Sequence, residues 1–212
     1  MFTSIKTYCD ELVNQFDTIP AGRKILLSKL SDYIAQKIQH HEEVNLVYIC
    51  THNSRRSHFG ELWAKVASTY FNIPRVRTFS GGTEATAFNP NAIRALEHIG
   101  FKIKQVRGGA NPVYEVQYSS GEPPIVCFSK AYNNAVNPKK AFAAIMTCSE
   151  AEKNCPFIPG AERRIACPYD DPKIFDGTAQ QDQKYSERCR QIAIECLYVF
   201  SYLNTQKLIL AS

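Results

Sequence analysis

The chain has 212 residues, of which 44% are hydrophobic and 21% charged, with a formal net charge of +5. This is ordinary globular composition, with enough chain for one well-filled core or for a core and a small appendage. A mildly basic balance suits a small anionic substrate, and without a dense Lys/Arg tract we expect no nucleic-acid partner. No run reaches the ~20 apolar residues that cross a bilayer, so no membrane partner is expected either.

The N-terminus lacks the basic stretch and apolar core that mark a secretory signal. We therefore expect a cytoplasmic protein, in which the eight cysteines are thiols rather than structural disulfides. None of them forms a Cys-x-x-Cys pair, which disfavours a zinc ribbon or a thioredoxin-type motif.

The pattern of apolar residues predicts alternating helices and strands along most of the chain. Residues 1–43 are predicted to be helical, because apolar residues recur there at helical spacing. After them the predicted elements are a strand at 44–49, a helix at 58–70, a strand at 76–80, a helix at 89–98, a hairpin at 113–128, strands at 142–147 and 164–167, and a helix at 179–204. Such alternation indicates an α/β fold with a parallel sheet. We divide the chain into an N-terminal helical extension, 1–43, and a catalytic domain, 44–212.

The loop between the first predicted strand and the next helix reads Cys50-Thr51-His52-Asn53-Ser54-Arg55-Arg56-Ser57. Backbone N–H groups in such a loop can point at one anion, and the helix N-terminus adds partial positive charge. The same field favours a thiolate at Cys50, the predicted nucleophile. Arg56 offers a planar fork for two oxygens of a tetrahedral anion, and the Ser57 hydroxyl can donate to the thiolate. Asn53 suits a left-handed turn, and residues 51–56 are predicted to bind the oxyanion.

Chemistry on such an anion needs a proton donor for the departing oxygen. The segment Asp170-Asp171-Pro172 follows the last predicted strand, and proline restricts the preceding Asp171 to an extended backbone. An Asp-Pro pair is also a common loop element. Asp171 is nevertheless the better candidate for the acid, and Asp170 the weaker one.

At these residues the chain resembles the low-molecular-weight protein tyrosine phosphatase family, whose loop is Cys-x5-Arg-Ser and whose acid loop resembles Asp171-Pro172. The resemblance covers roughly residues 44–205. It implies a three-layer sandwich, in which helices cover both faces of a central four-stranded parallel sheet. It also implies that the substrate is a tetrahedral oxyanion: arsenate, phosphate or phosphotyrosine.

The stretch around Cys148 and Cys155 resembles the thioredoxin-coupled arsenate reductases built on the same fold, which carry Cys-x6-Cys-Pro after the third strand. The resemblance implies that Cys50 attacks arsenate and that Cys148 attacks Cys50 and releases arsenite. Cys155 then captures Cys148 as a disulfide, which thioredoxin or a similar thiol reductant reduces. Cys189 and Cys196 share the same spacing, and we interpret them as core residues of the last helix. Spacing by itself therefore does not decide between a relay and a core.

A short helix is predicted directly after Cys148, because Ser149 and Glu152 have the spacing of a capping box. Pro156 disfavours helical geometry at Cys155, so the helix should end there. Seven steps of regular helix separate two Cα atoms by about 10 Å, more than a disulfide allows. Oxidation of the pair should therefore unwind this helix.

The sequence departs from the reductase pattern at His52, where glycine is usual, and at Arg55, where a further cysteine is typical. The alternative function is a phosphotyrosine phosphatase, but such enzymes often place tyrosines just after the Asp-Pro. Here Lys173 and Ile174 follow, and Tyr169 before the pair is the candidate substitute. A third hypothesis, an oxyanion sensor without turnover, is disfavoured by the retained acid, because binding needs no proton donor.

Some reductases of this kind bind potassium beneath the loop through Asn, Glu and Ser oxygens. Asn53, Glu61 and Ser80 fall at matching positions, so the resemblance implies a potassium site there. No other cofactor is required by the mechanism.

Overall fold

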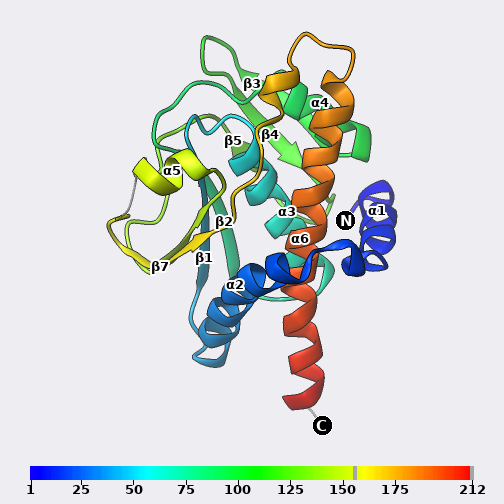
Figure 1. The fold of residues 1–212 in the computed structure, drawn as a ribbon, viewed down its shortest axis with the longest axis vertical. Coiled ribbons are helices and arrows are strands. Elements are labelled where there is room, and N and C mark those ends of the chain that lie inside the picture. Colours follow the sequence, from blue (N-terminus) through cyan, green and yellow to red (C-terminus); the bar gives the residue numbers. More distant parts are fainter. Residues whose placement is uncertain (155–156, 211–212) are drawn as a thin grey trace.

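In the computed structural model of the protein, the described residues are 1–154 and 157–210, with side chains described for 1–153 and 157–203. The elements follow in chain order (Figure 1): α1 (Thr3–Val13), the short 3-10 helix η1 (Phe16–Thr18), α2 (Ala21–Gln39), β1 (Val44–Cys50), α3 (Arg56–Tyr70), β2 (Val76–Gly82), α4 (Pro90–Ile99), β3 (Lys102–Arg107), β4 (Val113–Gln117), β5 (Ile125–Cys127), β6 (Phe142–Met146), α5 (Ser149–Asn154), β7 (Ala161–Ala166), the 3-10 helix η2 (Pro172–Phe175) and α6 (Gln181–Leu210). None of the described helices combines the length and apolarity needed to span a bilayer.

The central sheet is four-stranded and parallel, with the order β2-β1-β6-β7, which confirms the predicted sheet. The inner strands β1 and β6 are almost entirely buried because layers cover both of their faces. The edge strand β7 begins at Ala161, three residues before the predicted start. Its first residues, Glu162 and Arg163, are exposed, so this part of the strand carries no apolar pattern.

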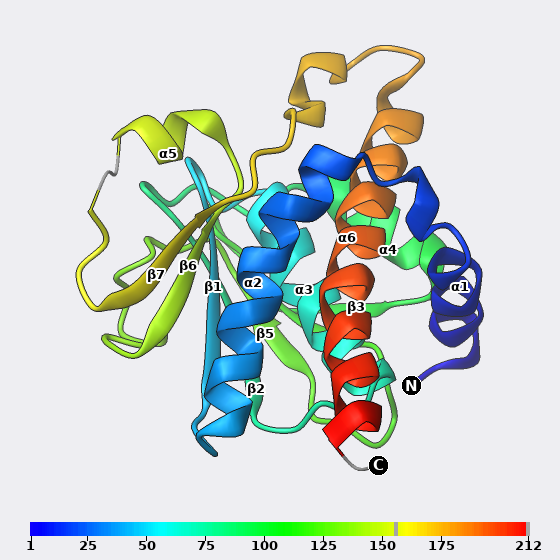
Figure 2. The same cartoon turned by 60° about the horizontal axis from the view of Figure 1, so that its bottom comes forward.

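Different layers cover the two faces of the sheet (Figure 2). Leu46 and Tyr48 of β1 lie in a large core with buried residues of α2, α3 and α6, whereas Val47 and Ile49 pack with Ala151 of α5 on the opposite face. This alternation follows from the two-residue period of a strand. The expected three-layer arrangement is therefore confirmed, with most of the helical mass on one side.

The N-terminal helices pack into the larger core. Ile5 and Leu12 of α1 and Leu30 of α2 are buried in the same cluster as Tyr48. Helix α1 contacts α6 and α4, and α2 contacts α6, β7 and β1. Burial of their apolar faces against the sheet-covering helices is what holds these two helices in place.

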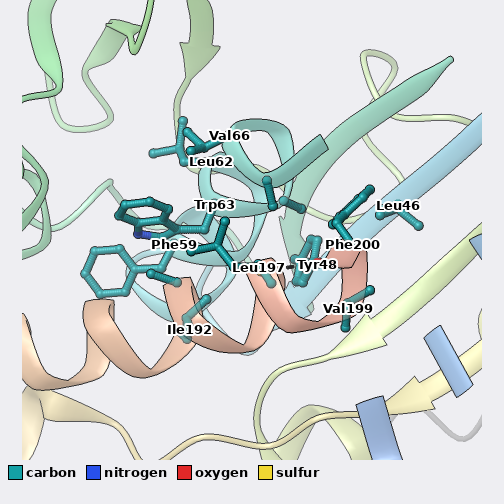
Figure 3. Packing of buried hydrophobic residues seen from close by; sticks show 14 of the residues in the cluster. Leu46, Tyr48, Phe59, Leu62, Trp63, Val66, Ile192, Leu197, Val199 and Phe200 are labelled. Carbon is teal, nitrogen blue, oxygen red and sulfur yellow. Dashed lines mark hydrogen bonds between the residues drawn. The ribbon is translucent and has the colours of Figure 1, made fainter. Parts of the chain in front are cut away.

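The packing of α3 against α6 forms the centre of this core (Figure 3). Trp63 of α3 donates its indole N–H to the Cys189 sulfur of α6 at 3.2 Å, and Tyr48 lies 3.9 Å from the Cys196 sulfur. Burial raises the pKa of Cys189 to about 12. Cys189 and Cys196 are therefore protonated core residues, as the sequence interpretation has it.

A separate three-stranded antiparallel sheet, β3-β4-β5, occupies the chain between α4 and β6. The predicted hairpin is confirmed, with Tyr114 opposite Cys127. Strand β3 was not predicted from the sequence, because five of its six residues are exposed and four are polar. After β5 the chain returns to the parallel sheet, where the Gly82 amide donates to the Lys130 carbonyl and the Tyr132 amide to the Gly82 carbonyl. This return places residues 128–132 beside the loop that follows β1.

Candidate active site

The loop after β1 places a thiol, a hydroxyl and an amide in one hydrogen-bonded row. Cys50 Sγ lies 3.1 Å from Ser57 Oγ, and Asn53 Nδ2 donates to that hydroxyl oxygen at 2.9 Å. Since the Ser57 oxygen accepts from Asn53, its own proton is free to point at the sulfur. Such a donor stabilises a thiolate and favours its departure as a leaving group. Asn53 adopts the left-handed backbone that the sequence predicts, with φ of 45°.

The backbone of the loop is held from outside through its carbonyl groups. The carbonyls of Cys50, Thr51 and Ser54 accept from the amides of Thr83, Glu84 and Asn89, and the His52 carbonyl accepts from the Ser129 hydroxyl. Across a trans peptide, the next N–H group points away from the carbonyl. The amides that follow these carbonyls therefore face the inside of the loop, as an oxyanion site requires.

Arg56 begins α3, two residues earlier than the predicted start, and its guanidinium is almost fully buried. Nη1 donates to the Tyr169 carbonyl at 2.8 Å, and Nη2 donates to Asp171 Oδ2 at 2.7 Å. The buried Nε has no partner among the described residues. A buried guanidinium N–H without an acceptor is costly, and an oxyanion in the loop would supply one.

Asp171 lies at the loop, where it bridges two arginines. Besides Arg56, it accepts from Arg55 Nε at 2.8 Å and from Arg55 Nη2 at 3.2 Å. Burial opposes ionisation of this carboxyl, but Arg56 and Arg55 outweigh it and hold the pKa of Asp171 below its ordinary value. The carboxylate is thus ionised, and it contacts part of the Arg56 guanidinium that an oxyanion would use. Arg55 contacts Asp171, a role that sequence reasoning did not identify.

Cys148 lies beside the same loop, directly before α5, which begins at Ser149 as the capping box predicts. Its buried sulfur is 3.4 Å from Thr51 Oγ1 and accepts from the Ala151 amide at 3.3 Å. Cys50 and Cys148 belong to one buried cluster. Cys155 lies outside the described residues, so the separation between its sulfur and that of Cys148 stays a prediction.

A pocket of about 650 Å³ opens over these groups and is lined, among others, by His52, Arg55, Arg56, Cys148, Asp171 and Ile174. His52 stands where the arsenate reductases usually have glycine. Its side chain turns out of the loop, and its Nε2 lies 2.9 Å from Glu84 Oε1. Tyr169 also lines the pocket, but it is only 7% exposed, its hydroxyl donates to Glu195 at 2.7 Å and the Arg23 guanidinium lies 4.6 Å from its ring centre. Its ring is therefore not free to stack on an aromatic substrate. The exposed side chains directly after the Asp-Pro are Lys173 and Ile174, and neither is aromatic.

Asn53, Glu61 and Ser80, the candidate potassium ligands, are all buried. The same region contains Lys130, whose Nζ lies 3.4 Å from Ser80 Oγ and whose amide donates to Asn53 Oδ1 at 2.8 Å. Burial raises the pKa of Glu61, but the Lys130 charge and His58, whose Nδ1 lies 3.7 Å from Glu61 Oε2, outweigh it and lower that pKa overall. Sequence reasoning missed Lys130 because no motif or periodicity surrounds it.

Comparison with known proteins places the chain in a family. The chain is 30% identical over 128 residues to an arsenate reductase of Brevibacillus brevis, covering 60% of this chain and 75% of that protein. It is 28% identical over 145 residues to an arsenate reductase of Bacillus subtilis, covering 68% and 86% of the two chains. No family model matches the chain.

The fold is similar to solved phosphatase structures. A low-molecular-weight phosphotyrosine phosphatase from Vibrio cholerae superposes with a TM-score of 0.54 at 11% identity, covering 77% of this chain and 98% of that one. A low-molecular-weight protein tyrosine phosphatase from Bacillus subtilis gives a TM-score of 0.51 at 14% identity, covering 77% and 99%. The chain therefore belongs to the low-molecular-weight protein tyrosine phosphatase superfamily of enzymes, and within it to the family of the arsenate reductases.

Proposed function

We propose that the protein reduces arsenate to arsenite, with Cys50 as nucleophile and Cys148 and Cys155 as a thiol relay. The observation that carries this proposal is the position of Cys148. Its thiol borders the oxyanion pocket, 3.4 Å from the Thr51 hydroxyl of the loop. Hydrolysis of a phosphate ester has no use for a second thiol at this place, whereas arsenate reduction requires one.

The first step forms a bond between the Cys50 sulfur and arsenic and breaks an arsenic–oxygen bond. Arg56 and the inward-facing loop amides bind the remaining oxygens, and the Ser57 hydroxyl stabilises the thiolate before attack. The departing oxygen leaves as water after receiving a proton from Asp171. An incoming anion displaces Asp171 from Arg56 and raises the proton affinity of that carboxyl, which prepares it to act as the acid.

The second step is the reduction. The Cys148 thiolate attacks the Cys50 sulfur, the sulfur–arsenic bond breaks, and its electron pair remains on arsenic, which leaves as arsenite. The two thiols are oxidised to a Cys50–Cys148 disulfide. Cys155 then attacks Cys148, which frees Cys50, and thioredoxin or a similar dithiol reduces the Cys148–Cys155 disulfide.

The test measures arsenate-dependent consumption of reduced thioredoxin beside hydrolysis of an aryl phosphate. Cys148→Ser should lose the first activity and keep the second, whereas Cys9→Ala, which removes a thiol of α1, should keep both. After one arsenate turnover, mass spectrometry should find a Cys148–Cys155 disulfide, and Cys155→Ser should instead accumulate Cys50–Cys148. If arsenate produces neither linkage while aryl phosphate is still hydrolysed, the reductase proposal fails and phosphotyrosine hydrolysis through a cysteinyl-phosphate takes its place.

A further inference from the structure

We propose that Lys130 is a positioning residue for the nucleophile Cys50. Its side-chain ammonium lies beneath the oxyanion loop and takes the place of a potassium ion bound from solution. This inference rests on the proposed role of Cys50. It assigns a function to the segment of residues 128–132, which the antiparallel sheet delivers to the loop.

The Lys130 ammonium is buried in a polar cluster. Lys130 is 3% exposed, and its Nζ lies 3.4 Å from Ser80 Oγ and 5.0 Å from the centre of the Phe128 ring. A buried lysine is stable only where an anion or several acceptors compensate its charge. Glu61, which is 4% exposed, supplies the negative charge of this cluster. No direct ion pair joins the two side chains in the described structure, but the Lys130 charge favours the ionised form of the Glu61 carboxyl.

Two other titratable groups face the same cluster. Ligand atoms of His58, Glu61 and Cys127 all lie within 4.8 Å of one another. Burial and the Lys130 charge lower the pKa of His58, although Glu61 acts in the opposite direction. Burial also raises the pKa of Cys127. Neutral His58 and Cys127 leave Lys130 and Glu61 as the charged members of the cluster.

A continuous row of hydrogen bonds connects Lys130 to the nucleophile. The Lys130 amide donates to Asn53 Oδ1 at 2.8 Å, Asn53 Nδ2 donates to Ser57 Oγ at 2.9 Å, and Ser57 Oγ lies 3.1 Å from Cys50 Sγ. Asn53 has a positive φ, a conformation that asparagine tolerates better than most residues, and its side-chain amide connects the loop to Ser57. Lys130 holds Asn53 by its amide, while its ammonium fixes the same segment to Ser80.

Asn53, Glu61 and Ser80 are the oxygen donors for which a potassium site is expected from sequence. In the structure Lys130 engages Asn53 through its amide and Ser80 through its ammonium, and its charge favours ionised Glu61. A side-chain cation is present at every moment and needs no ion from solution. The wild-type enzyme should therefore be indifferent to potassium.

The test uses the full-length chain and Lys130→Ala. Alkylation of Cys50 by iodoacetamide is quantified by mass spectrometry of its peptide across a pH series, without any oxyanion substrate. At pH 7 the variant should react about tenfold more slowly, the equivalent of one pH unit in the alkylation midpoint. Ammonium or potassium chloride should restore most of the rate, whereas tetramethylammonium chloride, whose cation is too large, should not. Lys104→Ala, at an exposed position of β3, is the matched control and should react like the wild type.

A neutral double variant, Lys130→Met with Glu61→Gln, guards against misfolding of the single variant, since it leaves no buried charge unpaired. It should fold, react slowly at Cys50 and gain nothing from ammonium. A wild-type alkylation rate in either folded variant, or failure of small cations to restore Lys130→Ala, would overturn the proposal. If wild-type Cys50 itself shows no enhanced reactivity, the proposed function fails instead.

Discussion

Asp171→Asn should separate binding from turnover in this enzyme. Asp171 Oδ2 accepts a hydrogen bond from Arg56 Nη2 at 2.7 Å, so an arriving oxyanion must displace the carboxylate from that guanidinium. The substitution removes the competing negative charge and also removes the acidic proton. We therefore expect tighter binding of inorganic phosphate together with slower chemistry.

The size of the binding effect follows from the contacts. Asp171 can keep its two bonds to Arg55, so only the Arg56 contact is lost when an oxyanion binds. A hydrogen bond to a charged group contributes about 1.5–3 kcal/mol. The Asp171 side chain is 22% exposed, which favours the lower limit. About 1.5 kcal/mol corresponds to a tenfold lower Kd for phosphate. Loss of the acid should slow aryl phosphate hydrolysis roughly 10²–10⁴-fold.

Isothermal titration with phosphate measures the first effect, and hydrolysis of aryl phosphates with leaving groups of graded acidity measures the second. The rate loss should shrink for the most acidic leaving groups, which hardly need a proton. Asp170→Asn is the matched comparison, because that carboxylate is 92% exposed and pairs with Arg188. We expect it to change neither quantity more than twofold, roughly the scale of a surface ion pair. Unchanged or weaker phosphate binding by Asp171→Asn, or an equal rate loss for every leaving group, would refute this reasoning.

Three further results are expected. Cys50→Ser should abolish arsenate reduction and aryl phosphate hydrolysis, and Arg56→Lys should severely impair both because an ammonium lacks the two-pronged contact. Near-normal turnover by either variant would contradict the proposed active site. Gly82→Ala should reduce hydrolysis and lower the free energy of unfolding in urea by about 1–3 kcal/mol. The reason is that the new Cβ would lie 2.6 Å from the Thr51 carbonyl oxygen and force the loop to shift. An active, fully stable variant would contradict this packing of Gly82 against the loop. Because the folded state lowers the pKa of Asp171, its stabilising effect is complete above the ordinary value of about 4 and is lost as pH falls through the folded value. Urea titrations at a series of pH values should therefore show a shallower loss of stability below about pH 4 for Asp171→Asn than for the wild type.

The parallel sheet and the oxyanion loop could be predicted from local patterns in the amino-acid sequence. Strands β1 and β6 are buried on both faces, so each appears in the sequence as a short, nearly continuous run of apolar residues. The loop is eight consecutive residues, and its left-handed Asn53 and its position before a helix are local properties. The start of α5 after Cys148 is likewise a local capping signal.

The distant groups that contact that loop could not be predicted, because the fold brings them together from far apart in the sequence. The contact of Arg55 with Asp171 joins positions 116 residues apart, and that of Lys130 with Asn53 joins positions 77 apart. Strand β3 and the first residues of β7 are exposed, so their sequences lack the periodic apolar residues that predict a strand. From the sequence, Lys130 would be predicted to be a surface lysine, because a lysine can be buried only where other groups compensate its charge. Those partners meet only when the antiparallel sheet returns the chain to the end of β2.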